Sequence, residues 1–136
     1  MGEKPRAACD VAAACFMRYA RYGFSGFEDD LFALCEIIRG STPSESEARR
    51  MLAVGDTLRI LRLSGRGETA AVVRAVYFVR HGRRPRRQEI SHRVRRFAAE
   101  NHLDERSVYR RLADAKRLLS RLLADADARR TGEGGN

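Results

Sequence analysis

The 136-residue sequence has little of several features that would place it in a particular class. It has no tryptophan, three prolines and only two lysines, so arginine carries almost all of its positive charge. The longest stretch without a charged residue, Val11–Met17, is far shorter than the ~20 residues of a membrane-spanning helix. The first residues also lack the pattern of a secretory signal peptide. These absences argue against a membrane or secreted protein, and we expect a cytoplasmic one.

Cysteine and histidine are also scarce. The cysteines, Cys9, Cys15 and Cys35, show no metal-site spacing, and we expect them to be small apolar residues on helices. The histidines are too widely spaced to suggest a ligand set, and there is no Gly-rich phosphate loop or Ser–His–acid arrangement. The one acidic cluster, Glu28–Asp30, falls at an expected helix start, where it would suit the helix dipole. The sequence therefore predicts no catalytic residues, no metal and no cofactor, and we do not expect an enzyme.

Positive charge is distributed very unevenly along the chain, whose net charge is +9. Residues 1–64 carry nine basic and nine acidic residues, whereas residues 65–136 carry eighteen basic and nine acidic residues. Between Arg80 and Arg96 there are eight arginines and a single acid, Glu89. Like charges this dense repel one another, and a merely solvated face seldom concentrates them so. This pattern predicts a polyanionic partner, and arginine is well suited to phosphate and guanine.

The apolar periodicity predicts an all-α protein, because no stretch alternates cleanly between apolar and polar residues. In the neutral half we expect a helix over about residues 5–22, stopped by Gly23. A second helix, capped by Ser25, should end at Gly40, and a third should start within Ser41–Glu47. Gly55 is expected to weaken the middle of the third helix. The apolar residues expected to face inward on the second and third helices are Phe27, Leu31, Leu34, Cys35, Ile38, Met51, Leu52, Leu58, Leu61 and Leu63.

The Ser64–Gly67 segment separates this N-terminal helical region, residues 1–64, from a basic region over residues 65–126. The basic region predicts a helix from about Thr69 to His81–Gly82, although its β-branched residues would also suit a strand. After an arginine-rich loop, two more helices are expected over about 88–102 and 105–126, the last one capped by Asp104. Residues 127–136 are expected to be a disordered tail.

The last expected helix has two opposite faces. Its apolar stripe consists of Val108, Leu112, Ala115, Leu119 and Leu122, and the opposite face carries Arg106, Arg110, Asp114, Arg117 and Arg121. A DNA recognition helix needs both, because one face packs on its own domain while the other offers long donors to bases and phosphates. The last two helices are therefore a candidate helix-turn-helix. An ordinary amphipathic helix with a solvated basic face has the same pattern.

The expected contact residues follow from this arrangement, with double-stranded DNA as the partner. Base contacts are expected from Arg106, Ser107, Arg110 and Arg111. Contacts to the DNA backbone or the minor groove are expected from Arg80, Arg83, Arg84, Arg86, Arg87, Arg93, Arg96 and Arg117. The alternative partner is RNA, because arginine-rich loops also bind RNA.

The segment Glu105–Leu119 resembles the recognition helix of sigma-factor region 4. In that family a valine, a leucine four residues later and an alanine three residues after that hold the helix on its core. Val108, Leu112 and Ala115 match this frame. Glu89–Ile90 matches the start of the family's preceding helix, and Val76–Phe78 resembles its first helix. The sequence departs from the family in the basic loop before Glu89 and in extra residues between Ile90 and Val108.

A region-4-like module joined to a separate helical segment resembles phage late-gene regulators, above all the lambdoid phage Q-type antitermination proteins. The aromatic run Phe16–Gly23 is similar to an aromatic-rich start in some of them. The resemblance implies a phage- or prophage-encoded protein that binds DNA near a late promoter and acts on bacterial RNA polymerase, so that transcription passes pauses and terminators. An activator or a repressor fits the same residues. The apolar residues of the neutral half are left with three roles: a core with the basic half, a homodimer seam or a polymerase contact.

Overall fold

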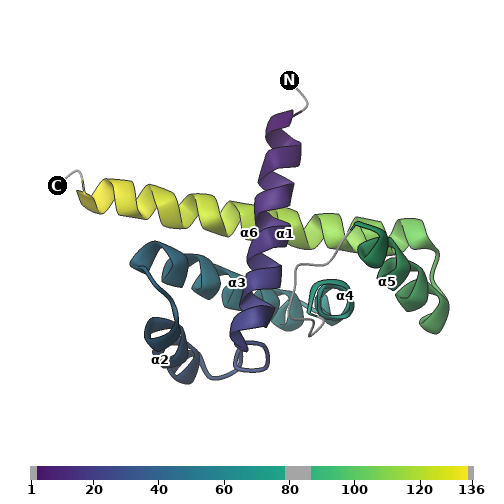
Figure 1. Cartoon of the computed structure of the whole chain (residues 1–136), viewed down its shortest axis with the longest axis horizontal. Helices are drawn as coiled ribbons and strands as arrows, with labels where there is room; N and C mark the ends of the chain where they lie inside the picture. Colours follow the sequence, from purple (N-terminus) through teal and green to yellow (C-terminus); the bar gives the residue numbers. More distant parts are fainter. Residues whose placement is uncertain (1–2, 79–86, 135–136) are drawn as a thin grey trace.

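The computed structural model describes residues 3–78 and 87–134, and the side chains within 11–78 and 88–128. Within these ranges the chain forms six helices and no strand, so the predicted all-α class is confirmed. The helices are α1 (Glu3–Tyr22), α2 (Leu31–Ser41), α3 (Glu45–Leu63), α4 (Gly67–Tyr77), α5 (Arg87–Glu100) and α6 (Glu105–Gly134). Figure 1 shows α6 along the longest axis of the molecule, with α1 crossing it steeply.

The end of α1 is formed by Gly23, as expected. Gly23 has a φ of +87°, which only glycine adopts at little cost, and its N–H donates to the carbonyl of Ala20 at 3.0 Å. The reversal turns the next residue, Phe24, into the core, where its ring packs edge-on against Tyr19 and stacks on Tyr22. The chain is thereby directed toward α2.

The start of α2 differs from the prediction. Ser25 does not cap it; the cap is Asp30, whose Oδ1 accepts from the N–H of Ala33 at 3.1 Å. Both residues are good caps, but the Ser25 hydroxyl accepts a hydrogen bond from Arg74 of α4 at 2.8 Å. Because the helix starts late, its buried face begins at Leu34, and two residues expected to be buried, Phe27 and Leu31, are exposed. Leu63, at the end of α3, is exposed as well.

Helix α3 begins where the sequence predicted and is continuous. Ser44 caps it by accepting the N–H of Glu47 at 3.1 Å. Gly55 was expected to be a weak point, but it is buried where α1 and α2 approach α3 closely. A Cβ at this position would lie 2.7 Å from Cδ2 of Leu34 and 3.5 Å from the Tyr19 hydroxyl. Glycine therefore allows a close contact between helices.

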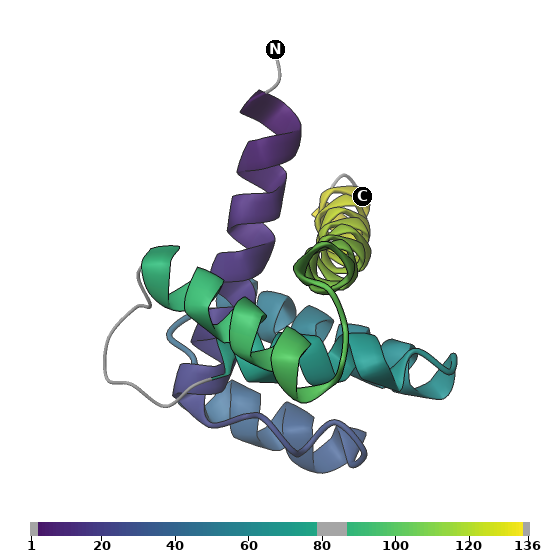
Figure 2. The same cartoon turned by 90° about the vertical axis from the view of Figure 1, so that its right-hand side faces the viewer.

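One hydrophobic core includes residues from both halves of the chain. Helices α1 and α3 each pack against both α4 and α6. The ring of Phe16 on α1 stacks on Tyr77 at the end of α4, with centroids 5.8 Å apart. Figure 2, which views α6 nearly end-on, shows it beside α1. The neutral half therefore shares a core with the basic half, which is one of the three roles open to it.

In the basic half, the buried faces of the helices agree with the predicted periodicity, but the helices end at other residues than predicted. The segment after Ser64–Gly67 is helical, as favoured, with Val72, Val73 and Val76 buried. It ends at Tyr77, and the expected end at His81–Gly82 lies outside the described residues. Helix α6 continues to Gly134 rather than stopping near residue 126, because alanine, aspartate and arginine follow without glycine or proline until Gly132. The predicted disordered tail is thus helical as far as Gly134.

Candidate nucleic-acid interface

Helices α4, α5 and α6 pack against one another in pairs, and a short turn, Asn101–Asp104, joins the last two. The N–H of Leu103 donates to the carbonyl of Ala98 at 2.9 Å, closing the end of α5. Between them His102 has a φ of +56°, a position usually taken by glycine. The turn joins α5 to α6, and α4 packs against both helices.

Asp104 caps α6, as the sequence predicted. Its Oδ1 accepts the N–H of Ser107 at 2.8 Å. The hydroxyl and the N–H of Ser107 both lower the pKa of Asp104, and the positive charges of Arg106 and Arg110 lower it further. The carboxylate therefore stays ionised next to the two arginines that were expected to contact bases. An incoming polyanion would compete with this carboxylate for their charge.

The two predicted faces of α6 are present. Val108, Leu112, Ala115 and Leu119 are buried, whereas Arg106, Arg110, Arg117 and Arg121 are exposed. The four arginines recur at spacings of four, seven and four residues, which places them in one row along the helix. We call them the arginine row. Since the buried side of α6 faces α1, α3 and α4, the row lies on the side of α6 away from these helices.

Two of the four predicted base-contact residues lie apart from this row. The guanidinium of Arg111 forms an ion pair with Glu68 of α4 at 2.9 Å and is partly buried. Ser107 is half-buried beside the Asp104 cap. Arg106 and Arg110 are brought together on the exposed face, one helical turn apart. Arg117 also lies in the row, where it forms an ion pair with Asp114.

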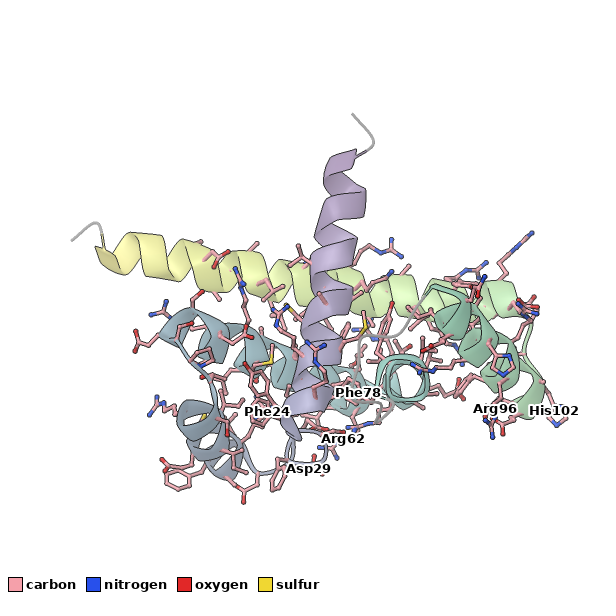
Figure 3. All side chains as sticks on the ribbon, in the orientation of Figure 1. Phe24, Asp29, Arg62, Phe78, Arg96 and His102 are labelled. Carbon is pink, nitrogen blue, oxygen red and sulfur yellow. The ribbon has the colours of Figure 1, made fainter. Side chains whose placement is uncertain are left out.

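The arginines of α5 differ in exposure. Arg93 is largely buried; its guanidinium donates to the carbonyl of Val76 at 2.8 Å and forms an ion pair with Glu89. It therefore ties α5 to the end of α4. Arg95 and Arg96 are exposed, and Arg96 makes an ion pair of 3.7 Å with the exposed Glu100. Figure 3 shows Arg96 and His102 toward the same end of the molecule, where α5 meets α6.

The predicted loop contacts cannot be placed on this surface. Arg80, Arg83, Arg84 and Arg86 lie outside the described residues. Arg87 is the first residue of α5, and its side chain is also outside the description. Their contribution to the interface stays a prediction.

Tyr109 was missed by the sequence reading. It is next to Arg110 on α6 and about half-exposed, and its hydroxyl lies 3.5 Å from the hydroxyl of Ser91 on α5. Tyrosine and serine hydroxyls commonly bind phosphate oxygens. Tyr109 falls on neither stripe of the helix, so no periodic signal marked it. Only the packing of α5 against α6 brings the two hydroxyls together.

A second polar group lies away from the interface, around Glu28. The sequence assigns Glu28 to the start of a helix, where the helix dipole would stabilise its charge. This assignment is wrong, because Glu28 is buried and precedes α2. It accepts from the Tyr19 hydroxyl at 2.8 Å and from the N–H of Gly26 at 2.7 Å, and it also forms an ion pair with Arg74 of α4. Figure 3 shows its neighbour Asp29 beside Arg62, and the two form an ion pair. A pocket of about 310 Å³ lies next to these pairs, and the charged side chains that line it form the two ion pairs with one another.

No protein-family model matches the chain, and comparisons with curated proteins and with solved structures also find no match. In the described part of the chain, no three His, Cys, Asp or Glu side chains are grouped so that they could hold a metal ion. None of the helices described is long and apolar enough to cross a membrane.

Proposed function

We propose that the protein is a sequence-specific DNA-binding transcription regulator in which α5 and α6 form a helix-turn-helix and α6 is the recognition helix. The observation that carries the proposal is the arginine row, which lies opposite a fully apolar face of α6. A recognition helix requires this division, because the apolar face anchors it while guanidinium groups bind guanine edges and phosphates.

The length of the row assigns different roles to its members. At 1.5 Å per residue, Arg106 and Arg121 are separated by about 22 Å along the helix axis. In helix-turn-helix proteins the N-terminal residues of the recognition helix contact the base edges, so the far end of so long a row lies beyond them. Arg106 and Arg110, next to the turn, would read bases. Arg117 and Arg121 would contact phosphates on the flanking backbone, together with Arg96 of α5.

The resemblance to sigma-factor region 4 is consistent with this assignment. The three residues that carry it, Val108, Leu112 and Ala115, are all buried on the inward face of α6. By that resemblance, the protein would act at a late promoter on bacterial RNA polymerase, as a phage-type antiterminator or late-gene activator. The arginine-rich loop would add backbone or minor-groove contacts. If roughly six phosphates are neutralised, the log–log salt dependence of binding has a slope of about −5.

The proposal is tested by selecting binders from a random duplex DNA library and measuring affinity by fluorescence anisotropy. We expect one enriched sequence to bind more tightly than scrambled DNA by about a thousandfold or more. Arg110→Ala should relax that preference, whereas Arg39→Ala, which removes an equal charge from α2, should not. No enriched sequence would contradict sequence-specific binding. A hairpin RNA that displaces the duplex at matched salt would favour the RNA-binding alternative.

The polymerase partner requires a separate measurement. Purified bacterial RNA polymerase is passed over the immobilised protein with and without the selected DNA. Retention of polymerase supports the antiterminator or activator role. DNA binding without retention indicates a plain repressor or activator.

A further inference from the structure

Three large apolar side chains are exposed together around the start of α2. Phe32 is 78% exposed, Leu31 is 43% exposed and Phe27, in the preceding connection, is 40% exposed. Leu31 and Phe32 belong to the first turn of the helix, so the three lie within a few residues of one another. Exposed apolar clusters with a polar rim commonly mark protein–protein contact sites.

Two exposed carboxylates border this cluster. Residues 25–47 contain six acidic residues, and four of them are paired with arginines: Glu28, Asp29, Glu45 and Glu47. The other two, Asp30 and Glu36, lie next to the apolar residues, and the exposed Arg39 follows Glu36 by one helical turn. Asp30 is exposed and directly precedes Leu31. Glu36 is exposed one helical turn after Phe32, on the same face of α2. Phe27, Leu31, Phe32, Asp30 and Glu36 are called the α2 surface.

The α2 surface lies away from the arginine row. Helix α2 packs on α3, and α3 separates it from α6 in both views (Figures 1 and 2). A partner seated on α2 would therefore leave the arginine row free. The α2 surface exposes apolar side chains with the carboxylates of Asp30 and Glu36, whereas the arginine row exposes guanidinium groups, so the two surfaces suit different kinds of partner.

We propose that the α2 surface docks an amphipathic helical segment of a partner protein, with apolar residues on one face and lysine or arginine on its flanks. Phe32 and Leu31 would enter the apolar face of that segment, while Asp30 and Glu36 would pair with the flanking cations. A second copy of the chain is the competing occupant, and the sedimentation measurement below distinguishes it. The proposal does not depend on DNA binding.

The test uses two fluorescein-labelled amphipathic peptides of about 18 residues, one of leucine and lysine and one of leucine and glutamate. Anisotropy is measured on titration with the full-length protein. Because the protein carries a net charge of +9, a basic peptide is repelled in general, and its binding requires a local acidic site. We expect saturable binding of the leucine–lysine peptide. The leucine–glutamate peptide can also bind the arginine row, so the variants below assign each peptide to its surface.

Three variants locate the binding. Phe32→Ser should weaken the leucine–lysine peptide at least about tenfold, and Glu36→Lys should weaken it and strengthen the leucine–glutamate peptide. Val11→Ser, which removes a 49% exposed apolar residue from α1, is the matched control and should bind as the parent does. Circular dichroism should show unchanged melting of Phe32→Ser, because its side chain is mostly outside the core.

Two results would overturn the proposal. One is equal binding of the leucine–lysine peptide by the parent and Phe32→Ser. The other is a sedimentation measurement in which the parent is a dimer and Phe32→Ser is a monomer, because the occupant would then be a second copy. DNA binding is measured in parallel, and an unchanged DNA affinity in Phe32→Ser keeps this result separate from the proposed regulator function.

Discussion

The hydroxyl of Tyr19 donates a hydrogen bond of 2.8 Å to the buried carboxylate of Glu28. The same carboxylate pairs with Arg74, so one acidic side chain connects α1, the segment before α2 and α4. A buried carboxylate is stable only when its oxygens are satisfied, and here a hydroxyl, a backbone N–H and a guanidinium satisfy them. The first helix of the basic half is thus held to the neutral half by a polar link as well as by the core.

Removing the Tyr19 hydroxyl should destabilise the protein. In Tyr19→Phe the Glu28 carboxylate loses one of its donors inside the core, and we expect a loss of about 1–3 kcal/mol in the free energy of unfolding. Urea denaturation followed by circular dichroism measures it. Tyr22→Phe is the control, because its hydroxyl makes a longer, 3.3 Å hydrogen bond to the less buried Glu47. Equal losses in the two variants would contradict a special role for the Glu28 link.

The same hydrogen bond predicts an alkaline loss of stability. Burial, and then the hydrogen bond to Glu28, raise the pKa of Tyr19 in the folded protein. The unfolded tyrosine ionises near pH 10, whereas the folded one keeps its proton, so the unfolded state binds fewer protons and stability falls as pH rises above about 10. Urea midpoints measured across this range should fall less steeply in Tyr19→Phe. Burial also raises the pKa of Cys15, and comparison in a Cys15→Ala background separates the two effects.

The sequence predicted most helices because their periods and caps are local. Gly23, Ser44 and Asp104 act at the ends of helices as expected. Of the predicted apolar stripe of α6, Leu122 is partly buried and the other four residues are buried. What failed depends on distant contacts. Asp30 replaced Ser25 as a cap while Arg74, forty-nine residues away, bonded to Ser25. The bond from Arg93 to the carbonyl of Val76, seventeen residues away, is a second contact of this kind. No spacing along the chain reveals such a pairing.

Gly55 illustrates the same limit and gives a third prediction. Gly55→Ala should destabilise by about 1–2 kcal/mol, although alanine favours helix, because the new Cβ would collide with Leu34. In a Leu34→Ala background the collision is gone, and the same change should stabilise by up to about 1 kcal/mol. Gly40→Ala, in α2 with no atom near its Cβ, is the control and should be neutral or stabilising. A stabilising Gly55→Ala in the parent would show that Leu34 moves aside freely. Thermal melts decide the sign.

The turn before α6 provides a fourth prediction. His102 has a φ of +56°, which costs a residue with a Cβ about 1 kcal/mol or more relative to glycine. His102→Gly should raise the free energy of unfolding by about 0.5–1 kcal/mol. The relief of backbone strain is partly offset, because glycine increases the conformational entropy of the unfolded chain. The opposite change at the end of α3, Gly65→Ala at a φ of +80°, should lower it. A destabilised His102→Gly would mean that the imidazole makes a contact that outweighs the backbone strain.

Arg93 and Arg96 on α5 should separate structural from DNA-binding arginines. Arg93→Ala removes the donor to the Val76 carbonyl and should lower the free energy of unfolding by about 1.5–3 kcal/mol. Arg96→Ala removes an exposed guanidinium and should leave stability within about 0.5 kcal/mol of the parent. On duplex DNA the result should reverse: Arg96→Ala should reduce the magnitude of the log–log salt slope by about 1, and Arg93→Ala should leave it unchanged. The slope is measured by anisotropy at several salt concentrations, below the melting temperature of the weaker variant. If Arg93→Ala flattened the slope while the protein stayed folded, Arg93 would be a phosphate contact after all.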